Sequence, residues 1–262
     1  METNLTGKRA IVCGASKGMG RATAVELASL GASVTIIARR GDVLEQVKAG
    51  LDTSKGQKHH ALAADMSDVK ALKEKITAHV KAQGPFHILV NNTGGPAAGP
   101  AHLAAVEDFE RAFTQHLLAS HVMVQAVIDG MKAEKYGRII NVISTSVKQP
   151  IKGLGVSNTI RAAVANWAKT LAGELGPFGI TVNNILPGPI DTDRMKEIVE
   201  GKSKSTGKSI AELIEIEKAT VPAGRYGTPE EIAQTIAFLA SPAAAYINGI
   251  NLPVDGGRTS SL

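Results

Sequence analysis

The chain has 262 residues and is poor in cysteine, in aromatic side chains and in long apolar runs. Its single cysteine, Cys13, can form no disulfide within the chain, so the cytosol is the expected compartment. Residues 1–7 are polar and no apolar run approaches the length of a membrane span, so we expect neither a secretory leader nor membrane insertion. Aromatic residues make up only 3%, which leaves few rings to stack on bases and argues against nucleic-acid binding despite a net charge of +5.

Internal repeats, low-complexity segments and Pro- or Ser-rich linkers are also missing, which argues against a multidomain chain. Hydrophobic residues make up 44% of the chain, enough for one α/β domain over residues 1–262. The histidines have no ligand spacing with cysteine or carboxylates, so no metal is expected.

Residues 9–31 predict a strand, a glycine-rich turn and a helix. Residues 10–13 form a short apolar run typical of a buried strand, and Gly14, Gly18 and Gly20 follow before apolar residues recur at helical spacing. Glycines let the backbone approach a pyrophosphate, and a helix N-terminus offers it unpaired N–H groups. The spacing is G-x-x-x-G-x-G rather than G-x-G-x-x-G, so a tight turn without a ligand is the alternative.

Residues 33–38 predict a second strand that ends at Arg39 and Arg40. In a dinucleotide fold the tip of this strand meets the adenosine ribose, where an acidic residue favours a free 2′-hydroxyl and an arginine favours a 2′-phosphate. With Lys17 in the glycine turn, the two arginines predict NADP(H) in preference to NAD(H). The alternative is that they are ordinary solvated charges.

Strands and helices continue to alternate along the chain. Further strands are expected at 60–64, 87–90, 138–144, 180–186 and 249–254, and further helices at 42–50, 67–83 and 229–240. This order predicts the α/β class, with a doubly wound, Rossmann-type parallel sheet and helices on both faces. Because ligands bind at the carboxyl ends of such strands, the glycine turn, Asp65 and residues 91–94 should share one crevice.

Additional motifs extend nearly from end to end. They are Asn91-Asn92-x-Gly94, Asn184-x-x-Pro187-Gly188-x-Ile190-x-Thr192, Gly224-Arg225-x-Gly227-x-Pro229-Glu230-Glu231, Phe238-Leu239-Ala240-Ser241 and Asp255-Gly256-Gly257. With the glycine turn and Asp65, they make the chain resemble the short-chain dehydrogenases/reductases, close to the 3-oxoacyl-carrier-protein reductases. The resemblance implies hydride transfer between a nicotinamide cofactor and a carbonyl or alcohol. The cofactor contacts it implies are Gly14, Ser16, Lys17, Gly18, Met19, Gly20, Arg39, Arg40, Asp65, Met66, Asn92, Gly94, Arg161, Pro187, Gly188, Ile190 and Thr192.

The family's chemistry uses a tetrad of Asn, Ser, Tyr and Lys, and this chain keeps only the serine. Ser144, at the end of the fifth strand, occupies the serine position. The tyrosine position thirteen residues later holds Ser157, and the lysine position four residues further holds Arg161. The asparagine position holds His116. The nearest tyrosines, Tyr136 and Tyr226, lie outside the pattern.

These replacements suggest an altered but working catalytic site. Ser157 and Arg161 lie one helical turn apart on the same face, and an arginine keeps the cationic role toward ribose or substrate oxygen. The hypothesis places a carbonyl between Ser144 and Ser157, Arg161 at the developing alkoxide and His116, titrating near neutral pH, as the proton donor. The alternatives are that His116 is only a packed helix residue, that Ser157 only enlarges the pocket, and that Arg161 pairs with a carboxylate.

A second functional class is a catalytically impaired dinucleotide-binding sensor or partner subunit, because the cofactor site looks intact while the acid/base residues have changed. The resemblance implies that residues 191–220 cover the substrate pocket as a lid. Residues 201–209 have loop composition and lie between helical segments at 192–200 and 210–219. The lysines of this lid suit a carboxylate, a phosphate or an acyl thioester carrier, or are simply solvated. The resemblance also implies a homotetramer or homodimer.

Overall fold

The computed structural model describes residues 1–261, apart from the side chain of Ser205, so Leu262 of the predicted domain lies outside the described residues. Its strands are β1 (Arg9–Cys13), β2 (Ser33–Ala38), β3 (His60–Ala63), β4 (Ile88–Asn91), β5 (Gly137–Val142), β6 (Ile180–Pro187) and β7 (Asn251–Val254). They form one parallel sheet in the order β3-β2-β1-β4-β5-β6-β7. The strand order reverses between β1 and β4, which confirms the predicted doubly wound, Rossmann-type architecture.

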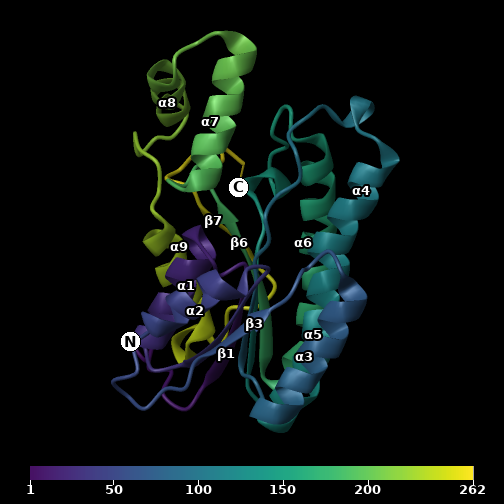
Figure 1. Ribbon diagram of the computed structural model, residues 1–262, viewed down its shortest axis with the longest axis vertical. Coiled ribbons are helices and arrows are strands. Elements are labelled where there is room, and N and C mark those ends of the chain that lie inside the picture. The colour runs from purple at the N-terminus through teal and green to yellow at the C-terminus, as the bar shows by residue number, and fades with distance from the viewer. Residues whose placement is uncertain (262) are drawn as a thin grey trace.

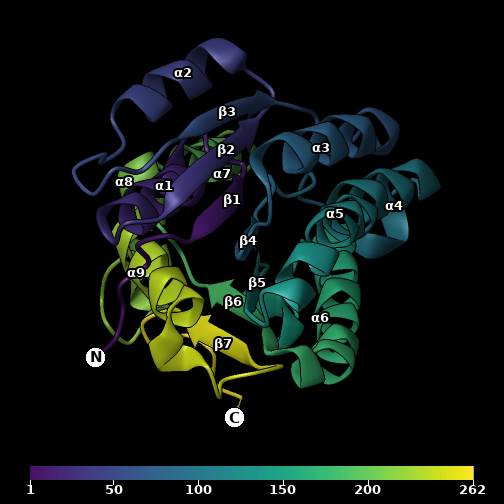
Figure 2. The same cartoon turned by 90° about the horizontal axis from the view of Figure 1, so that it is seen from below.

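Helices cover both faces of the sheet (Figure 2). On one face lie α1 (Gly18–Ser29), α2 (Gly41–Ala49) and α9 (Pro229–Ala240). The other face carries α3 (Val69–Gln83), α4 (Val106–Phe113), α5 (Ala119–Ala133) and α6 (Gly155–Leu175). Two further helices, α7 (Asp193–Thr206) and α8 (Ile210–Ala219), stand above the carboxyl ends of the strands (Figure 1). Over residues 1–261, none of the helices combines the length and the apolar character needed to cross a membrane.

The central strand β1 is buried from both sides. Val12 packs in the hydrophobic cluster that includes α1 and α9, whereas Ile11 and Cys13 pack in the cluster that includes α3 and α5. This two-sided burial explains why the strand reads as a continuous apolar run rather than an alternating one. Burial also raises the pKa of the Cys13 thiol to about 12, so this cysteine is a packing residue and stays protonated.

A ladder of asparagine side chains ties four strands together below the crevice. Asn91 Nδ2 donates to Asn141 Oδ1 (2.9 Å), Asn141 Nδ2 donates to Asn184 Oδ1 (2.9 Å), and Asn184 Nδ2 donates to Asn251 Oδ1 (2.8 Å). The same residues are register partners in the parallel pairs β4–β5, β5–β6 and β6–β7. Asn141 and Asn184 each use both a donor and an acceptor, whereas Asn91 Oδ1 has no partner among the described residues. A slip in register would therefore leave further buried polar groups without partners.

Two local expectations were wrong. The stretch expected as a loop at 201–209 is mostly helical, because α7 continues to Thr206, where Gly207 with φ +73° closes it. An ion pair from Lys202 to Glu217 of α8 holds this extension. The third helix begins at Val69 rather than at Ser67, because Asp68 caps it by accepting from Ala71 N (3.0 Å).

Candidate active site

The turn between β1 and α1 has no room for side chains at two of its glycines. A Cβ on Gly20 would lie 2.3 Å from Gly14 O, and one on Gly14 would lie 2.6 Å from Asn92 O. Asn92 Nδ2 donates to Cys13 O (3.3 Å) and Gly14 O (3.4 Å), which fastens the end of β4 to the turn. Gly14 and Gly18 also have φ values of +63° and +55°, the left-handed region that glycine tolerates. The glycine turn after β1 and Asn92 after β4 are therefore in direct contact at the carboxyl ends of the two strands.

The N-terminus of α1 is open toward this edge. Lys17 is its N-cap, makes no side-chain capping bond, and is followed by no acidic residue in the first turn. The first N–H groups of the helix therefore keep their capacity to bind an anion. The half-exposed Ser16 and Met19 flank Lys17 and Gly18 in this turn. The positive end of a helix dipole and a tight glycine turn are together suited to binding a pyrophosphate, so the residues present fit the phosphate groups of a dinucleotide.

Lys17 is already paired in this structure. Its Nζ lies 3.3 Å from Asp193 Oδ2 and 4.0 Å from Glu197 Oε1, both on α7. Thr192, another predicted contact, caps α7 by accepting from Met195 N (3.4 Å), and its Cγ2 would lie 3.5 Å from a Cβ on Gly18. The glycine turn and α7 are thus in direct contact, an arrangement that the spacing of the sequence did not indicate.

Arg39 and Arg40 are exposed at the end of β2, where the sequence predicts the 2′-phosphate site. Neither guanidinium has a hydrogen bond or an ion pair with any described residue. Asp65 accepts from Ser67 N (2.9 Å) and Ser67 Oγ (2.6 Å); these bonds, with a smaller contribution from the charge of Arg39, hold the pKa of its carboxyl below the usual value. Met66 beside it is buried. The two arginines are therefore free to receive a phosphate.

The remaining predicted cofactor contacts surround the ends of β4 and β6. Gly94 has open space where a side chain would stand. Pro187 ends β6, and Gly188 packs so closely on Asp255 that a Cβ would lie 2.7 Å from its Cα. Ile190 is buried and pairs with Gly227 through a parallel bridge.

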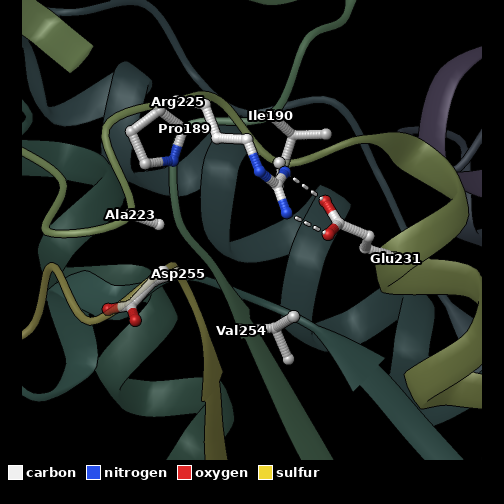
Figure 3. Close-up of a pocket in the computed structure, with 9 residues that line it drawn as sticks. Pro189, Ile190, Ala223, Arg225, Glu231, Val254 and Asp255 are labelled. Atoms are coloured by element: carbon white, nitrogen blue, oxygen red, sulfur yellow. Dashed lines mark hydrogen bonds and ion pairs between the residues drawn. The ribbon is translucent and has the colours of Figure 1, made fainter.

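A small cavity of about 90 Å³ lies beside this segment (Figure 3). Arg225 crosses it to form a two-pronged pair with Glu231, at 2.9 Å and 2.6 Å, and these bonds lower the pKa of Glu231 to about 2. Glu231 also accepts from Thr228 N in the capping box of α9. None of the four tetrad-position residues lines this cavity. We therefore interpret it as part of the packing contact between the end of β6 and α9, with a structural rather than a catalytic role.

The elements that carry the tetrad positions contact one another, because α6 packs against the turn that follows Ser144 and against the turn that contains His116. Ser144 follows β5 and its Oγ accepts from Ser146 N (3.1 Å), which leaves the hydroxyl proton free to donate. Ser157 and Arg161 lie one turn apart on α6, as predicted. No described residue forms a hydrogen bond with the half-buried Ser157 hydroxyl.

Arg161 is buried, with 7% of its surface exposed, and burial lowers its pKa to about 10. Its Nη1 donates to Val142 O (2.9 Å) at the end of β5. Its Nη2 lies 3.9 Å from the position of a Cβ on Gly95, so the guanidinium faces the loop after β4. No carboxylate of residues 1–261 comes within ion-pair distance of it. The interpretation that Arg161 simply pairs with a carboxylate was therefore wrong.

His116 lies in a π-helical turn, Thr114–Leu118, between α4 and α5. It is buried, its Nδ1 is hydrogen-bonded to Thr93 Oγ1, and its Nε2 has no partner among the described residues. The expectation that it titrates near neutral pH was wrong, because burial and then the charge of Arg161 lower its pKa to about 3. A neutral imidazole near Arg161 can donate or accept one hydrogen bond, but it holds no extra proton to give away at pH 7.

The two tyrosines outside the pattern have different surroundings. Tyr136 donates to Ala240 O (2.8 Å) at the amino edge of the sheet, as its sequence position predicted. The Tyr226 hydroxyl is buried without a partner among the described residues, and its pKa is raised by burial and then by Glu217 of α8.

Sequence reasoning missed two features of the site. Thr93 holds the ring of His116, and its place directly after Asn92 was an available signal. A cavity of about 270 Å³ lies between the loop after β4, α4 and the start of α6. Gln115 and Val156 line it, and they are the chain neighbours of His116 and Ser157. Within residues 1–261 there is no group of three His, Cys, Asp or Glu side chains placed to hold a metal ion.

Known proteins resemble the chain over almost its whole length. The family model described as enoyl-(acyl carrier protein) reductase matches residues 14–259. The NADPH-dependent reductase BacG of Bacillus subtilis (strain 168) is 34% identical over 260 residues, covering 98% of this chain and all of that protein. The 3-oxoacyl-[acyl-carrier-protein] reductase FabG of Vibrio harveyi is 35% identical over 97% of this chain and 98% of its own length. The structure of L-sorbose reductase from Gluconobacter frateurii, complexed with NADPH and L-sorbose, superimposes with a TM-score of 0.93 at 29% identity, covering both chains completely.

Proposed function

The chain belongs to the short-chain dehydrogenase/reductase family of NAD(P)-dependent oxidoreductases, and from this premise we propose that it uses NADP(H) to interconvert a carbonyl and an alcohol. The observation that carries the cofactor preference is the pair Arg39 and Arg40, two exposed guanidinium groups without partners at the end of β2. Two relatives support it by their names, because the BacG protein is called NADPH-dependent and the L-sorbose reductase was crystallised with NADPH.

The residues that would hold the dinucleotide follow the order of the crevice. The glycine turn and the N-terminus of α1 receive the pyrophosphate, Arg39 and Arg40 the 2′-phosphate, and Gly94 and the segment 187–192 the nicotinamide half. When bound, the cofactor supplies the hydride.

The substrate carbonyl would lie between Ser144 and Ser157, each with a hydroxyl proton free to donate. Arg161 stabilises the negative charge that grows on the oxygen, because a buried guanidinium acts in a low dielectric and stays charged well above pH 7. Ser144, Ser157 and Arg161 would thus stabilise the charge on the substrate oxygen, as the family's tyrosine and lysine do, but they would not pass on a proton.

His116 takes a different part from the one expected from the sequence. We assign the proton of the neutral ring to Nε2, with the Thr93 hydroxyl donating to Nδ1. Nε2–H is then a hydrogen-bond donor without a protein partner in a buried site. It orients or stabilises the substrate oxygen, and the alkoxide takes its proton from water that reaches the crevice.

The remaining proposals rest on the family. Residues 1–262 are taken as one domain, with α7 and α8 as the lid at about 191–220, and the chain as a homotetramer or homodimer in the cytosol. The substrate is a small carbonyl or alcohol compound, either anionic or an acyl thioester; the relatives called 3-oxoacyl-[acyl-carrier-protein] reductase support the latter class.

The test is turnover of NADPH with a panel of carbonyl compounds, compared among the wild type, Ser157→Ala and Arg161→Met. We expect the wild type to reduce at least one compound, and both variants to lose kcat while still binding NADPH, as followed by energy transfer from Trp167. Tight NADPH binding without turnover of any compound would favour the sensor or partner subunit instead. A folded protein that binds neither NADPH nor NADH would refute the oxidoreductase proposal.

A further inference from the structure

The two buried arginines, Arg138 and Arg161, differ in how many hydrogen-bond partners their guanidinium groups have. Arg138, at the amino edge of the sheet, donates to Gly137 O (2.8 Å), Gly179 O (3.3 Å) and Ser241 O (3.4 Å). Its guanidinium also lies 4.2 Å from the centre of the Tyr136 ring. Arg161 is comparably buried, at 7% against 3% exposed, but the bond to Val142 O is its only hydrogen bond to a described residue.

Burying a cation without a counter-charge is costly, and folded proteins pair or neutralise such groups. Arg161 stays charged, has no carboxylate partner in the described chain, and faces the open loop that contains Gly95. Ribose hydroxyls would satisfy some of its N–H groups, but they would not compensate its charge. Other groups around it are neutral: Ser157 one turn away, and His116, whose pKa of about 3 leaves it uncharged. The negative charge therefore has to come from a ligand.

We propose that Arg161 is the receptor for a carboxylate on the substrate, next to the reacting carbonyl, as in a 2-oxo acid. This inference rests on the proposed function for the identity of the reacting group. A guanidinium presents a planar fork of donors, and a 2-oxo acid presents one carboxylate oxygen and the adjacent carbonyl oxygen on the same side. With Nη1 committed to Val142 O, Nη2 and Nε are the groups left for this contact. The hydroxyl of Ser157 and Nε2–H of His116 provide further hydrogen-bond donors, and none of these groups carries a negative charge.

The experiment measures binding rather than turnover, so that it succeeds or fails apart from the proposed reaction. Oxamate and its neutral analogue oxamide are titrated calorimetrically into the protein, with and without NADPH; benzoate and benzamide serve as a larger pair. We expect the wild type to bind each carboxylate roughly 10- to 100-fold more tightly than its amide, because one charge-assisted contact is gained. Arg161→Met should reduce this ratio to about 1, and Arg161→Lys should restore part of it.

Thermal unfolding of the ligand-free variants provides the second readout. Arg161→Met removes an uncompensated charge, so its Tm should equal or exceed that of the wild type, and oxamate should raise the Tm of the wild type alone. Arg138→Met is the matched control: it removes a satisfied buried arginine and should lower Tm by roughly 5 °C.

An equal affinity of the wild type for oxamate and oxamide, and for benzoate and benzamide, would overturn the inference. A loss of Tm in Arg161→Met as large as that in Arg138→Met would also overturn it, because the charge would then be compensated inside the fold. A carboxylate preference that depends on Arg161 in a protein that reduces no carbonyl compound would support the anion site and reject the proposed reaction.

Discussion

The cofactor preference provides the sharpest test of the crevice. Arg39→Ala and Arg40→Ala remove exposed side chains that form no hydrogen bond or ion pair with residues 1–261, so neither change should disturb the fold. Lys17→Ala differs, since Lys17 must first leave Asp193 and Glu197 before it can reach a phosphate. The structure therefore predicts a larger loss of NADPH affinity for either arginine variant than for the lysine variant.

The size of the effect follows from the exposure of these groups. A hydrogen bond to a charged group contributes about 1.5–3 kcal/mol, and solvent reduces this for exposed arginines to about 1–2 kcal/mol. Each arginine variant should then lose roughly 5- to 30-fold in NADPH affinity. Because the two residues are adjacent, the double variant should fall short of the product of the single effects.

The assay is titration with NADPH and NADH, followed by energy transfer from Trp167, at low and at high salt. NADH affinity should stay unchanged, and the NADPH losses should shrink as salt screens the phosphate. Lys81→Ala is the control, because it removes an exposed cation near the end of α3, at the opposite edge of the sheet. Equal losses of NADPH and NADH affinity in the arginine variants would refute the assignment of the 2′-phosphate site.

Further outcomes follow from single contacts. Gly20→Ala should abolish binding of both nucleotides and lower Tm, because its Cβ would lie 2.3 Å from Gly14 O; retained NADPH binding would show that the turn relaxes. Thr228→Ala removes the N-cap of α9 and should cost about 1 kcal/mol in urea unfolding. Below pH 6.5 His116 takes up a proton in the unfolded chain, whereas in the folded protein it takes one up only near pH 3. The free energy of unfolding of the wild type should therefore fall as the pH decreases, by about 1.4 kcal/mol per pH unit more than that of His116→Asn. Lys17→Ala should speed amide hydrogen exchange in the first turns of α7. Unchanged exchange would show that the ion pairs of Lys17 with this helix do not stabilise it.

Local pattern was sufficient for most of the fold. The second strand at 33–38 and the last helix at 229–240 match the structure at both ends, because a short continuous apolar run, a capping threonine and a proline at the first helical position are all local signals. The extent of α7 was missed, since Gly201, Lys202 and Ser203 have loop composition and only contacts with α8 favour the helix. Tertiary packing overrode propensity there.

For the site, the sequence indicated the elements on which the candidate residues lie but not their chemical state. Spacing placed Ser157 and Arg161 on one helix, which the structure confirms, and placed Ser144 at the end of a strand, whereas β5 ends two residues earlier at Val142. The charge of His116 depends on burial and on Arg161, which are properties of the packed interior. The pairing of Lys17 with Asp193 joins residues far apart in the chain, and nothing in the spacing of either indicates it.

The π-helical turn at Thr114–Leu118 implies an unusual sensitivity to chain length. Such a turn contains one residue more than a regular helix would need over the same rise. Deleting a single residue there would let α4 and α5 join as one uninterrupted helix, while the side chains on one side of the deletion rotate by roughly 100° relative to the other. His116 would then lose the Thr93 hydroxyl although both helices remain intact. A one-codon deletion would therefore move the His116 side chain out of its present position without destroying either helix.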